Sequence, residues 1–548
     1  MIRHHHHLLL AASALLTPVA TAAQNPAPVV RAPAGPVAGT LDGDIRVFRG
    51  IPYAQAPIGS LRWKPPVPAP AWTSVRAATD FGPACIQPTP KAPNVYTPPA
   101  PLPTNEDCLS LNVWTPKHAT KAPVFVWIHG GSLVAGSSRE VTYDGRELAK
   151  RGIVVVSINY RLGALGWMAH PALSQESGQH VSGNYGLLDQ IAALQWVRRN
   201  IAGFGGDARN VTIAGESAGA LSVMFLMEAP TARGLFNKAV AESAYMISLP
   251  ELRRAAYGMP SGEAMGQMLQ AGLKAPDLAG LRAMSAQELT DRAAKLGFFP
   301  IGTVDGQILP AQMTTTFDEG KQAAVPILTG FNQGEIRSLR VLAAKAPTSA
   351  AAYEQAIRGR YGDLADAFLR LYPAADYQES ILEAPRDALY GWTAERLARK
   401  QQALGQRAYL YLFDHGYPAM DATDLHAFHA SELPYVFGTV KAAGPNWPAI
   451  PDTPAEHALS SAMVDYWASF ARNGVPTSRN APAWPAFGKD RAYLHITDTP
   501  RVRTALMPGM FELNETVMCR RRADGTQAWN WNVGLSAPTL PAKTAGCD

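Results

Sequence analysis

The strongest constraint on the fold of this chain is a short turn around Ser217, at residues 215–219 (Gly-Glu-Ser-Ala-Gly). The apolar run 211–214 before the turn predicts a buried strand, and the apolar run 221–226 after it predicts a helix. The two glycines lack the Cβ atoms that would clash in so tight a strand-to-helix turn. The pattern therefore predicts an elbow that holds a serine hydroxyl above the edge of a sheet, where it could act as a nucleophile.

A serine hydroxyl is a weak nucleophile near neutral pH, so a catalytic serine also needs a base, a group that orients this base, and donors for an oxyanion. A second buried strand is predicted at residues 124–128, and it ends in the turn 129–133 (His-Gly-Gly-Ser-Leu). Backbone N–H groups in such a turn can point at a developing negative charge. His129 in this turn has two interpretations: a structural histidine that closes the loop, which we prefer, and a catalytic residue.

Residues 106–114 (Glu-Asp-Cys-Leu-Ser-Leu-Asn-Val-Trp) resemble the second signature of the type-B carboxylesterase and cholinesterase family. Further blocks along nearly the whole chain resemble the same family, namely residues 48–54, 61–63, 159–163, 184–190 and 204–207. The resemblance implies an α/β-hydrolase fold, in which a central, mostly parallel, twisted sheet is flanked by helices and carries inserted cap or lid helices and loops. It also implies a serine hydrolase of carboxylic esters.

The resemblance assigns the acid and the base of a catalytic triad. Glu335 follows a predicted strand in the family's G-x-N-x-x-E pattern, although Gly334 stands where aspartate is common and Ile336 replaces the usual glycine. His429 stands three residues before a glutamate and ahead of residues 434–437 (Pro-Tyr-Val-Phe), as in the family's histidine segment.

The order Ser217, Glu335, His429 along the chain is that of α/β-hydrolases and differs from the orders in chymotrypsin and subtilisin. In the mechanism this implies, neutral His429 takes the proton of Ser217 as the hydroxyl attacks an ester carbonyl, and an acyl-enzyme forms. His426 is the alternative base, and its other interpretation is a loop histidine near the mouth of the site.

Further site residues follow from the same resemblance. The oxyanion hole would be formed by the backbone N–H groups of Gly131, Ser132 and Ala218. A buried polar network behind the triad of cholinesterase-like enzymes is matched by Glu216, Glu432 and Ser243. For Glu432, the alternative is that its carboxylate only accepts hydrogen bonds from backbone N–H groups near its own loop.

The substrate is the least constrained part of the prediction, because loops around the site rather than the triad set selectivity in this fold. The candidates to line the pocket lie near the catalytic blocks in sequence: Leu133, Tyr245, Phe298, Phe299, His426 and Phe428. Aromatic residues belong more often to a core, so each of them has that alternative. An apolar pocket would suit small to medium aliphatic or aromatic esters.

Several other activities remain compatible with the sequence. The chain could be a specialised hydrolase of a polyester, carbamate, feruloyl or mycotoxin ester, or an amidase that uses the same serine. A rival from another class is a binding protein of the same fold without catalysis, and the complete triad argues against it.

The chain has four cysteines, and an even number in an exported chain favours disulfides. By the resemblance, Cys85 and Cys108 form the first loop disulfide of the family. The remaining pair, Cys519 and Cys547, would tie the C-terminal tail to the body, and the sequence leaves open whether these two pair. The spacings of the four cysteines do not match zinc sites, and we expect neither a metal nor a cofactor.

Between the first two cysteines lies the Pro-rich stretch 88–103. If they pair, this stretch is a stiff loop closed at its base, and in the family such a loop overhangs the entrance to the site. Val95 and Tyr96 are then available for substrate contact, and a plain surface loop is the alternative.

The first 23 residues have the layout of a secretory signal peptide, with Arg3, an apolar stretch from Leu8 and small residues at 20–23. We therefore expect a secreted or periplasmic protein, with residues 24–548 as a single catalytic domain with lid insertions. The apolar stretch is short and alanine-rich for a stable membrane span, and an uncleaved anchor is the alternative. Net charge is only +5 over 548 residues and no Lys/Arg-rich block occurs, so nucleic acid is not an expected partner. The expected partners are a small-molecule ester and water, with the protein a monomer or dimer.

Apolar patterns predict the remaining elements. Cap helices are expected at residues 262–271 and 281–296, and a further helical block is expected at 351–405. Later strands are expected at 408–413 and 492–496, with a helix at 463–470.

Overall fold

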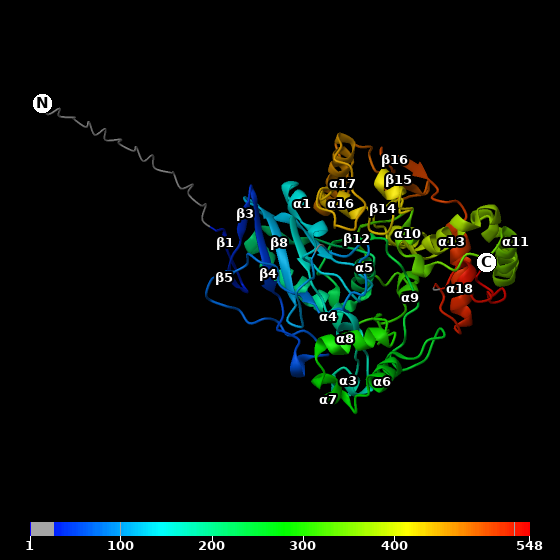
Figure 1. Cartoon of the computed structure of the whole chain (residues 1–548), viewed down its shortest axis with the longest axis horizontal. Coiled ribbons are helices and arrows are strands. Elements are labelled where there is room, and N and C mark those ends of the chain that lie inside the picture. Colours follow the sequence, from blue (N-terminus) through cyan, green and yellow to red (C-terminus); the bar gives the residue numbers. More distant parts are fainter. Residues whose placement is uncertain (2–26, 99, 531, 548) are drawn as a thin grey trace.

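The computed structural model describes residue 1 and residues 27–98, 100–530 and 532–547, so the predicted signal peptide lies almost entirely outside the described residues. Its centre is a sheet of eleven strands in the order β16-β15-β14-β13-β12-β11-β9-β10-β8-β4-β3 (Figure 1). These strands are β3 (Thr40–Asp42), β4 (Ile45–Pro52), β8 (Ser110–Pro116), β9 (Ala122–Ile128), β10 (Val154–Ile158), β11 (Gly206–Glu216), β12 (Lys238–Glu242), β13 (Ile327–Asn332), β14 (Ala408–Phe413), β15 (Ala492–Ile496) and β16 (Arg501–Thr504).

The central part of the sheet is parallel and its edges are antiparallel. All neighbours from β10 through β9, β11, β12, β13 and β14 to β15 pair in parallel. Antiparallel pairing joins β3, β4, β8 and β10 at one edge, and β15 and β16 at the other. Because the carboxyl ends of parallel strands meet at one edge of a sheet, the loops after β9, β11, β12 and β13 can build one site there.

Alternate residues of the central strands face two different cores, as the two-residue period of a strand requires. In β9, Val124, Val126 and Ile128 belong to one buried cluster, whereas Phe125 and Trp127 belong to another. The first face is covered by α4 (Tyr185–Asn200), α5 (Ala218–Glu228) and α14 (Trp392–Ala403). The second face is covered by α1 (Arg146–Lys150), α16 (Leu433–Phe437) and α17 (Pro454–Asn473). Burial of both faces explains why these strands are continuous apolar runs.

Two groups of inserted helices extend from this three-layered body (Figure 1). One group shares a small core and consists of α2 (Gly163–Trp167), α3 (Pro171–Glu176), α6 (Gly262–Leu273), α7 (Leu278–Ala283) and α8 (Ala286–Lys295). The other lies near the C-terminus and consists of α11 (Ala350–Tyr361), α12 (Ala365–Leu371), α13 (Tyr377–Arg386) and α18 (Met510–Asp524). Short helices complete the chain: α9 (Met313–Asp318), α10 (Glu335–Ser338) and α15 (Pro418–Asp421).

Most of the predicted elements are present, with one correction. The strands predicted at 408–413 and 492–496 are β14 and β15, and the helix predicted at 463–470 lies within α17. The helical stretch predicted at 281–296 is present but interrupted, because the chain forms α7 and α8 with a break between them. Ser285 causes this break, since its hydroxyl accepts a hydrogen bond from the Glu288 N–H (3.2 Å) and caps the start of α8.

Two small sheets and two disulfides lie outside the central sheet. In one small sheet, β2 (Gly35–Ala38) pairs with β1 (Val29–Ala32) on one side and β5 (Arg76–Ala77) on the other, and in the second sheet β6 (Ala84–Cys85) pairs with β7 (Thr104–Asn105). The structure pairs Cys85 with Cys108 and Cys519 with Cys547. Within the described residues, no helix is both long and apolar enough to cross a membrane.

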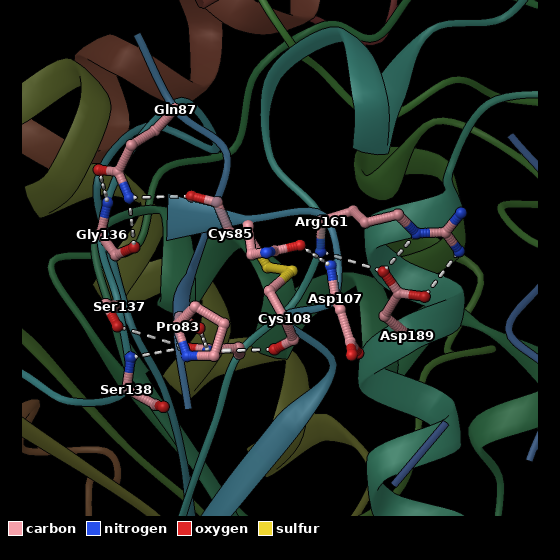
Figure 2. The surroundings of a disulfide bond; sticks show 12 residues. Pro83, Cys85, Gln87, Asp107, Cys108, Gly136, Ser137, Ser138, Arg161 and Asp189 are labelled. Carbon is pink, nitrogen blue, oxygen red and sulfur yellow. Dashed lines mark hydrogen bonds and ion pairs between the residues drawn. A yellow bond between two sulfur atoms is a disulfide. The ribbon is translucent and has the colours of Figure 1, made fainter. Parts of the chain in front are cut away.

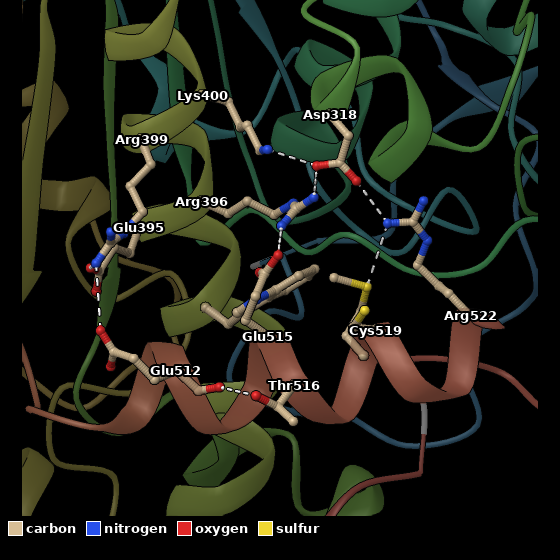
Figure 3. A network of polar contacts seen from close by, with 12 residues as sticks. Asp318, Glu395, Arg396, Arg399, Lys400, Glu512, Glu515, Thr516, Cys519 and Arg522 are labelled. Atoms are coloured by element: carbon tan, nitrogen blue, oxygen red, sulfur yellow. Dashed lines mark hydrogen bonds and ion pairs between the residues drawn. The ribbon is translucent and has the colours of Figure 1, made fainter. Parts of the chain in front are cut away.

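An ion network holds α18 against α9 and α14 (Figure 3). The Arg396 side chain on α14 is only 1% exposed, and it forms ion pairs with Asp318 and Glu515. Asp318 also lies 2.7 Å from Lys400 Nζ and 2.8 Å from the Arg522 guanidinium. One carboxylate at the end of α9 thus joins three cations from two other helices.

Candidate active site

Ser217 lies in the tight turn between β11 and α5. Its backbone has φ 56° and ψ −121°, a sparsely populated conformation for a residue with a side chain. The Ser217 N–H donates to the carbonyl oxygen of Glu242 (2.9 Å), so strand β12 fixes the turn. A Cβ on Gly215 would lie 2.5 Å from the carbonyl carbon of Gly219, and one on Gly219 would lie 2.1 Å from the carbonyl oxygen of Ile128. Both positions therefore require glycine, for the reason that the motif predicted.

Two other loops bring His429 and Glu335 together in the buried region beside this turn. Nδ1 of His429 hydrogen-bonds to Oε2 of Glu335, and the Glu335 side chain is fully buried. The other oxygen of Glu335 accepts hydrogen bonds from the Ser243 hydroxyl (2.6 Å) and the Asn332 N–H (2.8 Å). These bonds fix the carboxylate, which in turn fixes the imidazole ring and its Nδ1 proton.

Glu216 contacts the other ring nitrogen. Its Oε1 lies 3.0 Å from Nε2 of His429, the atom that would receive the proton of Ser217. Among the described residues, no hydrogen bond joins the Ser217 hydroxyl to His429, so Glu216 takes that place at the ring. Burial lowers the pKa of His429, but the carboxylates of Glu216 and Glu335 outweigh burial and hold this pKa well above its usual value.

Three more carboxyl groups lie in this region, and the charge of Glu216 acts on each of them. Glu432 accepts a hydrogen bond from the side-chain amide of Asn332, and Glu242 accepts one from the Trp467 indole (2.9 Å). Burial is the main cause that raises their pKa values, to about 8 for Glu242, to about 7 for Glu140, and well above the usual value for Glu432.

Glu242 and Glu140 were missed by the sequence reasoning. The signal for Glu242 was its place at the end of a buried apolar strand, directly before Ser243, where a charged residue is unexpected.

The turn after β9 supplies backbone donors beside the elbow. A Cβ on Gly130 would lie 3.3 Å from Cβ of Ser217, which shows how closely the two loops approach. Gly131 and Ser132 both have positive φ (101° and 57°), and Ala218 begins α5. None of the three N–H groups of Gly131, Ser132 and Ala218 donates a hydrogen bond to another described residue. They are therefore able to stabilise an anion, with the positive end of the α5 dipole.

The His129 side chain packs against Tyr160 and holds the turn after β9 in place. Its ring stacks on Tyr160 (centroids 4.5 Å apart), its Nδ1 lies 2.9 Å from the Gly130 carbonyl oxygen, and the Tyr160 hydroxyl donates to the His129 carbonyl (2.8 Å). Burial lowers the pKa of His129 to about 4, so the ring is neutral. This environment favours the structural interpretation of His129.

The carboxylesterase family model matches residues 26–511. The chain belongs to the carboxylesterase family. It is 36% identical over 491 residues to the fumonisin B1 esterase of Sphingopyxis macrogoltabida, with 86% of each chain covered. It is 35% identical over 478 residues to the para-nitrobenzyl esterase of Bacillus subtilis strain 168, covering 85% of this chain and 94% of that one.

Solved esterase structures have the same fold as this carboxylesterase. A PNB esterase structure superposes with a TM-score of 0.75 at 32% identity, covering 88% of this chain and 99% of the other. The carboxylesterase of Geobacillus stearothermophilus gives a TM-score of 0.75 at 33% identity, covering 90% and 99%. These matches confirm the predicted α/β-hydrolase fold and show that the protein is a carboxylic-ester hydrolase.

Two tyrosine rings lie one behind the other next to the His429 ring of this carboxylesterase, with Tyr390 in contact with it and Tyr245 behind Tyr390. The Tyr390 ring lies 5.4 Å from the His429 ring, and Tyr245 packs edge-on against Tyr390 (6.0 Å). Tyr390 lies in the π-helical segment Asp387–Gly391 between α13 and α14, a kind of segment that is frequent at functional sites. Tyr245 was a candidate from sequence, whereas Tyr390 was not, because its register depends on this local irregularity.

The other pocket candidates of the carboxylesterase have different surroundings. Leu133 is fully buried, and Phe428 is buried against Trp447 (ring centroids 4.7 Å apart). Phe298 packs into the small core of the inserted helices α6 to α8, and Phe299 is 45% exposed. The structure thus places Tyr245 against Tyr390, which packs on the His429 ring, whereas Phe298 belongs to a separate core.

His426 has both ring nitrogens occupied by carboxylates outside the triad. Nδ1 lies 2.8 Å from Asp421 on α15, and Nε2 lies 3.1 Å from Asp414 after β14. This arrangement fits a loop histidine better than the alternative base. The loop that carries His426 also explains why residue 334 is a glycine, since a Cβ at this position would lie 1.7 Å from the His426 carbonyl oxygen. The Gly334 N–H donates to the Ala427 carbonyl (2.9 Å), so the acid loop and the base loop touch directly.

Proposed function

We propose that this carboxylesterase cleaves its substrate through an acyl-enzyme on Ser217, with His429 as the base and Glu335 as its partner. The observation that supports the proposal is the buried His429–Glu335 pair, which the Ser243 hydroxyl and the Asn332 N–H orient. The complete set of groups also argues against a binding protein without catalysis.

In the first half-reaction, the Ser217 hydroxyl attacks the ester carbonyl and its proton passes to Nε2 of His429. The carbonyl oxygen becomes an oxyanion, which the N–H groups of Gly131, Ser132 and Ala218 stabilise, each by typically about 3 kcal/mol. His429 then donates the proton to the alcohol oxygen, the C–O bond breaks, and the acyl-enzyme remains.

In the second half-reaction, water attacks the acyl carbon and His429 takes its proton. The second tetrahedral intermediate breaks down, the acid leaves, and Ser217 regains its proton from His429. Glu335 stabilises the imidazolium in both halves. Because Glu216 contacts Nε2 in the structure, its carboxylate must release the ring before each proton transfer.

For the substrate, we propose small to medium apolar or aromatic carboxylic esters. The aromatic rings of Tyr245 and Tyr390 beside the base support this class, because they offer apolar contact surface near the reacting carbonyl. The specialised alternative has one defined candidate, since a 36% identical relative is named fumonisin B1 esterase.

Hydrolysis of p-nitrophenyl esters of increasing acyl length, with the Ser217→Ala protein as the blank, tests the proposal. We expect turnover by the parent and a loss of at least about 10³-fold in the variant, because the nucleophile is removed. The thermal midpoint should hardly change, since the hydroxyl makes no hydrogen bond to a described residue. A folded Ser217→Ala protein with parental turnover would place the nucleophile elsewhere.

Fumonisin B1 and p-nitrophenyl butyrate, assayed side by side, separate the general esterase from the specialist. A kcat/KM that is at least about 100-fold higher for fumonisin B1 would favour the specialist, because such a ratio needs dedicated contacts. A matched ester and anilide pair excludes or supports the amidase, since an amine leaving group demands stronger protonation by His429.

We also propose that residues 24–548 act as one exported catalytic domain, as a monomer or dimer. The two disulfides support export, because disulfides persist in oxidising compartments. Amino-terminal sequencing of the protein from the periplasm or medium tests it, and an intact Met1 in the cytosolic fraction would contradict it.

A further inference from the structure

The Pro-rich loop 88–103 is anchored where it leaves and rejoins the body, around the Cys85–Cys108 disulfide (Figure 2). The Cys85–Cys108 disulfide closes the loop. The Gln87 side chain donates to the carbonyl of Gly136 (3.2 Å) and accepts from its N–H (3.1 Å), which ties the loop to the segment after the oxyanion turn. The loop therefore starts and ends at a fixed place on the body.

Within this loop, a side-chain turn presents Tyr96. The Asn94 side-chain oxygen accepts from the Tyr96 N–H (2.9 Å), and the Asn94 carbonyl accepts from the Thr97 N–H (3.0 Å). The Tyr96 ring then packs against the rings of Phe428 (6.3 Å) and Trp447 (6.5 Å). Phe428 directly precedes the proposed base, so the ring already contacts the base loop.

The hydroxyl of Tyr96 joins the two segments that carry the base and the acid. It donates to the carbonyl oxygen of His429 (3.0 Å) and lies 2.6 Å from the hydroxyl of Ser338. A phenol has one proton and a carbonyl can only accept, so Ser338 must be the donor in the second bond. Ser338 ends α10, and Glu335 begins this four-residue helix. Burial raises the pKa of Tyr96 well above its usual value, which keeps the donating proton in place.

We propose that Tyr96 is a positioning residue that clamps the backbone of His429 to the helix of Glu335. This inference rests on the proposed function, because it takes His429 as the base. The imidazole must exchange between Glu216 and Ser217 during turnover, so small shifts of its backbone alter the distance over which the proton moves. Misplacement of a catalytic group by about 1 Å can cost 10²-fold in rate.

The Tyr96→Phe substitution tests the clamp, because it keeps the ring against Phe428 and Trp447 and removes both hydrogen bonds. We expect kcat for a p-nitrophenyl ester to fall about tenfold while KM stays within about twofold. The loss should be larger for the ethyl ester of the same acid. An ethoxide leaving group depends on proton donation from His429, and p-nitrophenoxide does not.

Tyr417→Phe is the matched control. Tyr417 lies in the same aromatic cluster as Phe428, and its hydroxyl donates to the carbonyl of Pro448 (2.9 Å), away from the base loop. This variant loses a comparable hydrogen bond, and its kcat should stay within about twofold of the parent. Thermal midpoints of both variants show that they are folded.

A second variant, Ser338→Ala, removes one half of the clamp and leaves the bond from Tyr96 to His429. Its kcat should fall less than that of Tyr96→Phe, and the double variant should lose no more than Tyr96→Phe alone, because both changes disrupt one unit.

Several outcomes would overturn the clamp. An increase in KM with unchanged kcat would make Tyr96 a substrate contact instead. Equal losses on the nitrophenyl and ethyl esters, with a fall in thermal midpoint matched by Tyr417→Phe, would make it merely structural. Retention of activity by Ser217→Ala would refute the proposed function itself. Loss of activity in Ser217→Ala with an unaffected Tyr96→Phe would refute only the clamp.

Discussion

The protonation of His429 depends on two carboxylates, one at each ring nitrogen. Glu335 binds Nδ1 and Glu216 contacts Nε2, and both favour the charged ring. In the proposed mechanism His429 acts only when neutral, so we expect its raised pKa to place the acidic limb of the pH–rate profile above the range of an ordinary histidine.

Glu216→Gln should move this acidic limb to lower pH. The substitution removes one of the two charges that raise the pKa of His429, so the ring becomes neutral at a lower pH. The measurement is kcat/KM for a neutral ester between pH 5 and about 9. Glu432→Gln, which changes a buried carboxyl without a contact to the ring, should shift the limb less. A limb that stays in place in Glu216→Gln would show that Glu216 does not act on the base.

At this scale, sequence motifs can propose chemistry-bearing residues, whereas they do not predict contacts between distant segments. Ser217, Glu335 and His429 stand in short patterns that can be found in one segment each. The bond from Tyr96 to His429 joins residues 333 positions apart, and the place of Tyr390 depends on a π-helical register. No local sequence pattern predicts such contacts, so only the structure reveals them.

At the scale of single elements, backbone packing at the turn between β11 and α5 decides which side chains fit there. Gly219→Ala should destabilise the protein by about 1–3 kcal/mol and abolish most activity. The new methyl group would lie 2.1 Å from the carbonyl oxygen of Ile128, so β9 or α5 must shift. Gly178→Ala is the control, because its Cβ would meet no atom within 4 Å.

Urea unfolding and esterase rates of both glycine variants check this expectation. Gly178→Ala should stay within about 0.5 kcal/mol of the parent. A Gly219→Ala protein of parental stability and activity would contradict the close packing of the elbow.

Apolar patterns predicted which segments form strands and helices, and capping chemistry explains where they failed. Strands such as β14 are continuous apolar runs because both faces are buried. The run 281–296 has helical periodicity throughout, but Ser285 competes for the backbone N–H of Glu288 and starts a new helix. A serine inside a helical pattern was the signal that could have predicted this break.

At the scale of the whole molecule, charge networks join parts of the chain that are distant in sequence. Asp318 on α9 meets Arg396 and Lys400 on α14 and Arg522 on α18. Burial tends to raise the pKa of Asp318, but the three cations outweigh it and lower this pKa.

Asp318→Asn should therefore lower the free energy of unfolding by roughly 1–2 kcal/mol near pH 7, a figure discounted for the partial exposure of this side chain. Because the folded pKa lies below the unfolded value, the stabilisation is complete above about pH 4 and is lost as the pH falls further. The difference between parent and variant should thus shrink in acid. Asp452→Asn, in an exposed pair with Lys441 (3.0 Å), should have a much smaller effect. A variant difference that does not change with pH would contradict the ionic origin.

The carboxylates around His429 also affect how readily the acid product leaves the site. Glu216 and Glu335 flank His429, and their carboxylates favour positive over negative charge at this place. The acid that hydrolysis releases is itself an anion near neutral pH, so it is repelled from the place where it forms, whereas a neutral ester is not. We expect weak product inhibition, with an inhibition constant for the free acid well above the KM for its ester.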